Sequence, residues 1–406
     1  MKALLSTRRW HSIAPIALAI PLCVWLILIG VPAHLESSCH WKQWPVLPGC
    51  QSPERLSTEQ QVAALRDYLT TNPGDSRSYA ELARFATQPE ALLKSSGAAV
   101  LNAAKLTAPF DATVLELLAS QALQTSDWVA AVDRLVLLAE TYRNANARTV
   151  LAILFAQSEE IPGLSAALLA AAQNDQRWLE SVVRAMPGAK VPVSSAVQVA
   201  GRLAQTQGLT VKLGRLLIKQ LRAEGAWIDA HAIWLSLWKQ PLGFLFNGDF
   251  EKPFIPDAFD WEVVDRKPYQ AGAQAGLCRS GKHGQVLLVK FTGRAIKTPI
   301  VRQNLILPAG KYQFEGEFQS ANLRSNEGLT WALSCGNDKQ PLARSPALNR
   351  NGGKWSSFSV TFRVGPACGP LVTLSLQTQA AYEAKTGQHG DMLFDHFTIT
   401  RESAGD

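Results

Sequence analysis

The pattern of the sequence changes abruptly at residues 245–251, LFNGDFE. Before this segment, apolar residues recur at the spacing of amphipathic helices, with almost no strand-like runs. After it, short runs of alternating polar and apolar residues are separated by glycine and proline, as in antiparallel sheets. A chain of 406 residues with these two patterns is expected to form a multidomain protein, α-helical first and then β.

An apolar run near the N-terminus predicts where these domains are located. No charged residue occurs from Ile13 to Val31, and Arg8 and Arg9 precede the run. A helix of this length at about 1.5 Å per residue nearly crosses a hydrocarbon core of roughly 30 Å. We therefore expect a single-pass signal anchor in the cell inner membrane, with the bulk of the chain periplasmic or otherwise extracytoplasmic. A cleaved signal peptide is the alternative.

The cysteines fit an exported protein. Cys39 and Cys50 enclose a short loop that a disulfide would close in an oxidising compartment. Cys335 and Cys368 form a second candidate pair in the strand-rich half, and Cys278 has no evident partner. The spacing of cysteine and histidine residues does not follow a zinc-binding motif.

Charge and motifs argue against several classes of function. The net charge of +7 is modest, and the basic residues are scattered, so we do not expect nucleic-acid binding. Motifs of nucleotide-binding proteins, zinc proteases and α/β-hydrolases are absent, which favours a protein that is not an enzyme. The one catalytic hypothesis is a glycan hydrolase in which Glu315 and Glu317, roughly 6–7 Å apart on one strand face, form the carboxyl pair. A solvated strand face is the favoured interpretation.

The helical half shows an internal period. Leu82, Leu118 and Leu154 recur at intervals of 36 residues, and a second series lies three residues earlier in the same register. A period in the thirties with two helices per unit indicates an α-solenoid, in which each helix pair buries its apolar face against its neighbours. Residues 125–131 (TSDWVAA) and 223–230 (AEGAWIDA) resemble the turn and second-helix start of tetratricopeptide repeats. The resemblance implies a face that binds an envelope protein partner.

Three tryptophans near the end of the helical half share one helix face. Trp227, Trp234 and Trp238 lie at positions i, i+7 and i+11. We expect them to be mainly core residues that pack against the next domain, because large aromatic side chains are usually buried. An exposed binding stripe is the alternative.

From about residue 244 the period falls to two, which predicts an antiparallel sandwich of short strands. The predicted strands are Phe244–Glu251, Asp260–Val264, Gln285–Phe291, Val301–Leu307, Lys311–Gln319, Gly328–Ser334, Trp355–Val364, Leu371–Leu376 and Met392–Thr400. In the first of these, Phe246 and Phe250 are expected on one sheet face, with Asp249 and Glu251 on the other.

The two ends of this half, NGDFE at 247–251 and LFDHFTI at 393–399, resemble galactose-binding-type jelly rolls, including carbohydrate-binding modules. The resemblance implies a structural calcium where the first and last strands meet, held by Glu251 and Asp395 and also by Asp249. His396 stands where the family often has a second acid. The alternative is that these carboxylates accept backbone hydrogen bonds at a strand junction. No other cofactor is expected.

Sugar sites combine aromatic platforms with a few polar groups. The aromatic residues available for such a site are Tyr269, Trp331, Trp355 and Tyr382, although Trp331 and Trp355 are more often expected in a core. The expected domains are a cytoplasmic N-terminus with a transmembrane signal anchor (1–33), a disulfide-closed linker (34–56), a tetratricopeptide-like helical repeat domain (57–241) and a jelly-roll β-sandwich (242–402).

Architecture and resemblance together favour a membrane-anchored, exported scaffold or binding protein of the bacterial cell envelope. In this hypothesis it supports synthesis or export of a surface polysaccharide, with the solenoid docking a protein partner and the sandwich contacting glycan. A pure protein–protein interaction scaffold with a structural β-sandwich is the alternative.

Overall fold

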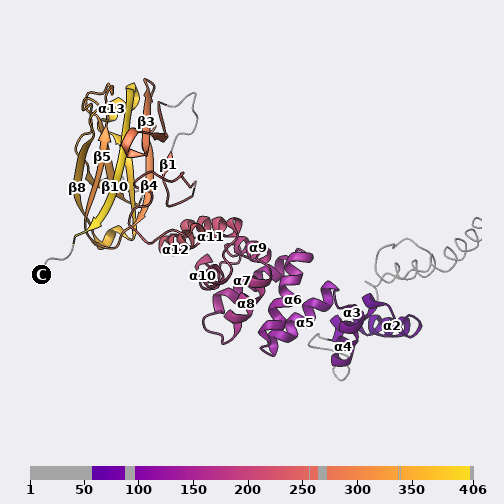
Figure 1. Ribbon diagram of the computed structural model, residues 1–406. Helices are drawn as coiled ribbons and strands as arrows, with labels where there is room; N and C mark the ends of the chain where they lie inside the picture. The colour runs from indigo at the N-terminus through magenta and orange to yellow at the C-terminus, as the bar shows by residue number, and fades with distance from the viewer. Residues whose placement is uncertain are drawn as a thin grey trace, which may run out of the picture. The chain divides into compact units, whose positions relative to one another are not determined.

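The computed structural model confirms the predicted order of helices followed by strands (Figure 1). It describes residues 57–86, 97–255, 257–263, 272–336, 338 and 340–402. The expected anchor at residues 13–31 and the expected Cys39–Cys50 disulfide lie outside the described residues. Within the described part, no helix is both long enough and apolar enough to span a membrane. The chain divides into two compact units, Met1–Ser126 and Asp127–Asp406.

The first unit contains four described helices. They are α2 (Thr58–Thr71), α3 (Ser76–Ala86), α4 (Gly97–Thr107) and α5 (Ala112–Gln124). Ser57 begins α2 with a capping box, because its hydroxyl accepts from the Gln60 backbone while the Gln60 side chain accepts from the Ser57 backbone. Leu82 of α3 and Leu118 of α5 are buried, as their 36-residue spacing predicted.

The second unit begins with seven α-helices and ends with the β-domain. The helices are α6 (Trp128–Thr141), α7 (Ala145–Gln157), α8 (Leu164–Asn174), α9 (Arg177–Ala185), α10 (Val197–Thr206), α11 (Val211–Ala223) and α12 (Trp227–Trp238). The helices α6, α8, α10 and α12 pack in succession, as do α7, α9 and α11. This two-layered stacking is that of an α-solenoid. The helices α6, α8, α10 and α12 begin 36, 33 and 30 residues apart, so the predicted period is variable.

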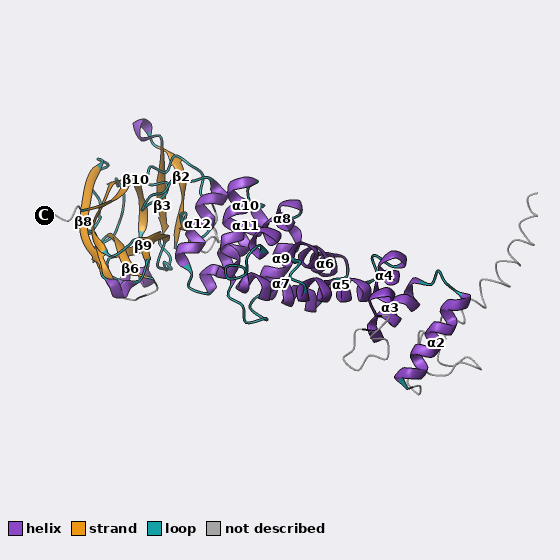
Figure 2. Ribbon diagram, turned by 90° about the horizontal axis from the view of Figure 1, so that it is seen from below, coloured by secondary structure: helices purple, strands orange, loops and turns teal. Residues whose placement is uncertain are grey.

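The β-domain is a sandwich of two five-stranded antiparallel sheets, whose strands Figure 2 shows in orange. One sheet has the order β1-β4-β9-β6-β7 and the other β2-β3-β10-β5-β8. The strands are β1 (Glu262–Val263), β2 (Ala273–Arg279), β3 (Gln285–Thr292), β4 (Val301–Ile306), β5 (Gly310–Gln319), β6 (Leu329–Cys335), β7 (Pro341–Arg344), β8 (Ser356–Val364), β9 (Leu371–Thr378) and β10 (His389–Arg401). The aromatic rings of Trp331, Phe314 and Phe397 lie in the core between the sheets.

The predicted disulfide between Cys335 and Cys368 is present. It joins the end of β6 to a short 3-10 helix before β9. Cys278 on β2 is a free cysteine and is half-buried. The sandwich therefore contains one covalent cross-link within its described residues.

The predicted strand Phe244–Glu251 is wrong, because this segment forms a turn. Asn247 and Phe250 have left-handed backbones with φ of +49° and +54°, a conformation that Asn tolerates better than most residues. The Asn247 side chain donates to the Lys252 carbonyl at 2.8 Å and accepts from the Lys252 amide at 3.0 Å. These bonds direct Phe250 into the core, where its ring lies 5.3 Å from those of Trp261 and Phe397.

The junction between α12 and the sandwich confirms the prediction for two of the three tryptophans. Trp234 is 1% exposed, and its ring packs against Phe246 at 5.0 Å and Phe259 at 6.0 Å. Trp227 contacts the Phe259 ring edge-on at 6.4 Å. Trp238 instead packs under the guanidinium of Arg215, 5.5 Å from the ring centre.

Candidate functional site

The site begins at a bulge in β10. The ladder between β5 and β10 shifts register between Asp395 and Thr398, so that His396 and Phe397 face no direct partners on β5. His396 takes a left-handed backbone with φ of +54°. Phe397 points into the core and is 3% exposed, whereas the His396 side chain is exposed. The bulge thus turns a histidine outward while filling the core with the next residue.

Asp395, just before the bulge, is completely buried. Its Oδ2 lies 2.9 Å from Nδ1 of His283 and 3.5 Å from Nε2 of His396, and its Oδ1 accepts from the His396 backbone amide at 2.8 Å. Burial raises the pKa of the Asp395 carboxyl, while the hydrogen bonds from His283 and His396 oppose this shift. A buried carboxylate requires such donors, so it holds both imidazoles close to one point.

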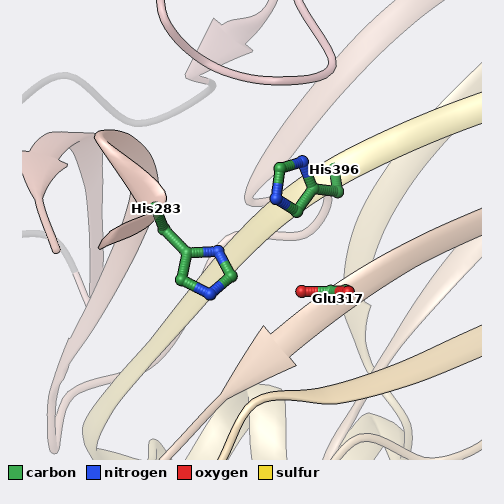
Figure 3. Close-up of side chains that lie close together, drawn as sticks. All are labelled: His283, Glu317 and His396. Atoms are coloured by element: carbon green, nitrogen blue, oxygen red, sulfur yellow. The ribbon is translucent and has the colours of Figure 1, made fainter. Parts of the chain in front are cut away.

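Trp355 and Glu317 complete the group, and Figure 3 shows Glu317 with the two histidines. His283 lies in a 3-10 helix (Gly281–His283) between β2 and β3, and Trp355 precedes β8 and stacks on the His283 ring, with ring centres 4.0 Å apart and planes at 19°. Glu317 lies on β5 opposite Asp395 in the ladder. One potential ligand atom from each of His283, Glu317 and His396 lies within 4.8 Å of the others. We call His283, Glu317, Trp355, Asp395 and His396 the histidine patch.

A row of hydrogen-bonding side chains adjoins the patch on β5 and β8. Alternation along these paired strands places the polar residues on the outer face and the aromatic residues in the core. The outward residues, which we call the polar strip, are Gln313, Glu315, Glu317 and Gln319 of β5 and Ser357, Ser359 and Thr361 of β8. The Gln313 amide donates to Glu315 at 2.6 Å and to Ser359 at 3.1 Å. Glu315 and Glu317 thus share an outer strand face, as predicted.

The structure brings together only some of the predicted aromatic residues. Trp355 is half-buried beside His283, and Tyr382 is 49% exposed on α13 (Ala381–Thr386). Trp331 is 0% exposed in the sandwich core, as the sequence favoured. Its ring therefore has no face that a ligand could contact. Tyr269 lies outside the described residues.

The three carboxylates expected at a calcium site are not gathered. Asp249 is exposed, and Glu251 accepts a hydrogen bond from the Gln285 backbone amide at 2.9 Å. Asp395 bonds to histidine instead. Among the described residues, the group of three potential metal ligands consists of His283, Glu317 and His396. Calcium binding by Glu251 and Asp395 stays a prediction.

A concavity lies between α11 and the first sheet of the sandwich, and we call it the polar pocket. Its lining residues are Arg222, Asp257, Ala258, Asp260, Trp261, Glu262, Arg302 and Asn304. Most are already paired: Arg302 donates to Glu262 at 2.9 Å, and the Asn304 amide donates to the Ala258 carbonyl at 3.0 Å. Burial raises the pKa of Asp260 to about 6, although the amides of Ile255 and Trp261 donate to its carboxyl. This saturated network favours a structural role.

His283 is the residue of the patch that sequence reasoning missed. It follows β2, a strand rich in alanine and glycine that carries little strand signal and was not predicted. It contacts Asp395 across 112 residues of chain. Pairing of this kind depends on sheet register, which a single sequence does not show.

No family model matches the chain, and no curated protein matches it. A solved CBM4 structure is 16% identical and covers 39% of this chain and 99% of that chain, with a TM-score of 0.31. TmCBM61 in complex with beta-1,4-galactotriose is 15% identical and covers 40% of this chain and 100% of its own, with a TM-score of 0.25. The CBM22-1 xylan-binding domain from Paenibacillus barcinonensis Xyn10C is 15% identical and covers 38% and 92%, with a TM-score of 0.26. The sandwich itself is defined by the strand pairing of its two sheets.

Proposed function

We propose that the β-sandwich binds a glycan across the histidine patch and the polar strip, with the Trp355 ring as the platform. The observation that carries this proposal is a half-exposed indole fixed at the edge of a row of hydrogen-bonding side chains. Stacking on His283 supports one face of the ring, so little side-chain freedom remains to be lost on binding.

The chemistry of the surface suits a sugar. A pyranose ring presents C–H groups that pack on an aromatic face and hydroxyls that require both donors and acceptors. The polar strip supplies hydroxyl donors from Ser357 and Thr361, and its carboxylates supply acceptors. Apolar platforms with a few placed polar groups are the usual composition of small-molecule sites.

The proposal also covers the cellular location of the protein and a partner for its helical repeats. We propose that the anchor at residues 13–31 holds the chain on the inner membrane, that its bulk is extracytoplasmic, and that it supports synthesis or export of a surface polysaccharide. The Cys335–Cys368 disulfide supports export, because such bonds persist in oxidising compartments. Leu106 and Phe110, which are 82% and 69% exposed near the end of α4, support a protein partner for the helices.

The test uses the purified full-length chain on a glycan array, followed by calorimetric titration of the best ligand. Trp355→Ala is expected to weaken binding about ten-fold or more, because it removes the central apolar anchor. Tyr382→Ala is the matched control, since it removes an exposed aromatic residue from a different element. An array without ligands, or equal affinities for the two variants, would contradict the proposal and favour the pure interaction scaffold.

A further inference from the structure

The geometry points to a site for one divalent transition-metal ion of the zinc class in the histidine patch. His283, His396 and Glu317 supply three ligands in this inference, and the buried Asp395 carboxylate orients His283 by a hydrogen bond to its Nδ1. It adds a metal to the surface proposed for glycan but does not depend on a glycan being bound there.

The distances within the patch fit such an ion. In a tetrahedral site with metal–ligand bonds of about 2.0–2.1 Å, neighbouring donor atoms are separated by roughly 3.3–3.4 Å. Asp395 Oδ2 lies 2.9 Å from Nδ1 of His283 and 3.5 Å from Nε2 of His396, so this carboxylate lies beside both potential histidine ligands. Potential ligand atoms of His283, His396 and Glu317 are within 4.8 Å of each other, which small side-chain rotations can close.

The ligands come from three elements that the fold holds rigidly. His396 is fixed by the bulge of β10, Glu317 by its place on β5 opposite Asp395, and His283 by stacking on Trp355. Figure 3 shows the two imidazoles and the carboxylate around one small space. Ligands that are already oriented lose little conformational freedom when a metal binds.

Charge and hydrogen bonding also favour a cation here. Within the described part of the chain, the half-buried carboxylate of Glu317 makes no hydrogen bond or ion pair. Asp395 is wholly buried, and a cation would neutralise it together with Glu317. Two imidazoles and one carboxylate around one point are a ligand set that zinc and neighbouring transition metals accept.

The same ligand set disfavours calcium. Calcium takes six to eight oxygen ligands, whereas this patch offers two nitrogens and few oxygens. The calcium site expected from the sequence also included Asp395. The neighbours of Asp395 are histidines, however, because His283 hydrogen-bonds to its carboxylate and His396 follows it in the chain. Zinc is therefore expected to bind and calcium is not.

The test is a titration of the full-length chain, freed of metal by a chelator, with zinc chloride in a calorimeter. Cobalt(II) titration followed by visible absorption reports whether the ion is tetrahedral. We expect one zinc ion per chain at this site and intense tetrahedral cobalt bands. His396→Ala and Glu317→Gln are each expected to weaken zinc binding at least ten-fold, because each removes one ligand. His396 is exposed and Glu317→Gln keeps the side-chain shape, so both variants are expected to fold.

His389→Ala is the matched control, since it removes another exposed histidine of β10 that lies outside the group. Equal loss of zinc affinity in His389→Ala and His396→Ala, absence of zinc binding, or binding of calcium in place of zinc would overturn the inference. Trp355→Ala separates the two proposals, because it is expected to weaken glycan binding about ten-fold or more while zinc still binds. A wild-type chain that binds zinc but no glycan would contradict only the proposed function, and a wild-type chain that binds glycan but no zinc would contradict only the metal site.

Discussion

Asp260 offers a direct test of how burial changes the chemistry of this sandwich. Its side chain lines the polar pocket, the residue is 2% exposed, and its carboxyl accepts from the Trp261 amide at 2.7 Å. Burial penalises the charged carboxylate more than these donors stabilise it, so the pKa rises from 3.8 to about 6. Replacing Asp260 by asparagine keeps the shape and removes the titration.

The direction of the pH dependence follows from whether the folded or the unfolded chain holds the Asp260 proton. Between pH 3.8 and about 6 the folded chain keeps the Asp260 proton, whereas the unfolded chain has lost it. The folded state therefore binds more protons, and the free energy of unfolding falls as the pH rises through this window. At 1.36 kcal/mol per pKa unit, the change from 3.8 to about 6 corresponds to about 3 kcal/mol.

The assay is urea unfolding of the full-length chain at several pH values from 4 to 7.5, followed by near-UV circular dichroism of the aromatic core. The free energy of unfolding of the wild type, minus that of Asp260→Asn, is expected to fall by about 2.4 kcal/mol across this range, because the unfolded chain has already begun to lose the proton at pH 4. Asp249→Asn, which removes an exposed carboxylate from the same domain, controls for the change in net charge. A constant difference between wild type and Asp260→Asn would refute the reasoning.

Two further predictions concern the sandwich core. Replacing Cys335 and Cys368 by serine removes a cross-link over 33 residues and is expected to lower the free energy of unfolding by about 3–4 kcal/mol, measured by urea unfolding without reductant; unchanged midpoints would contradict this. Gly316→Ala places a Cβ against the Phe397 ring, well inside van der Waals contact, and is expected to lower the free energy of unfolding by about 1–3 kcal/mol, whereas Gly276→Ala, with no atom within 4 Å, controls for the loss of a strand glycine. Equal midpoints for these two variants would show that the ring can move aside.

The helical half was readily predicted because its signal is local. The apolar spacing that marks a helix involves neighbours in sequence, and Leu154 of the predicted series is buried on α7. The repeat was also evident, since Leu118 and Leu154 occupy buried positions in alternate helices. What the sequence did not show is the variation of the period, which follows from helix and turn lengths.

The sandwich was predicted less completely because pairing partners are distant. Strands with strong alternation, such as β5 and β8, were located within a residue or two of their true ends. The segment 244–251 also alternates, but its asparagine-capped turn prevails over that pattern. The strand β2 was missed because alanine and glycine carry little preference for a strand.

Four of the five members of the histidine patch were singled out separately, but His283 and the assembly of the group were not predicted. Trp355 was considered for sugar, Asp395 for metal and Glu317 for catalysis, each on local grounds. Their meeting depends on the register of β5 against β10 and on the bulge after Asp395. Neither the register nor a one-residue irregularity can be read from the alternation of side chains alone.

The bulge in β10 couples the interior of the domain to its surface. Phe397 reaches into the space that Gly316 leaves open, and the residue before it is thereby forced to face solvent. Deleting one of the two bulge residues would restore regular pairing, in which a single residue opposes Gly316 and Thr398 still pairs with Glu315. The outward position of His396 therefore depends on the packing of Phe397 against Gly316, and a larger residue at position 316 would displace the histidine although that position lies in the core.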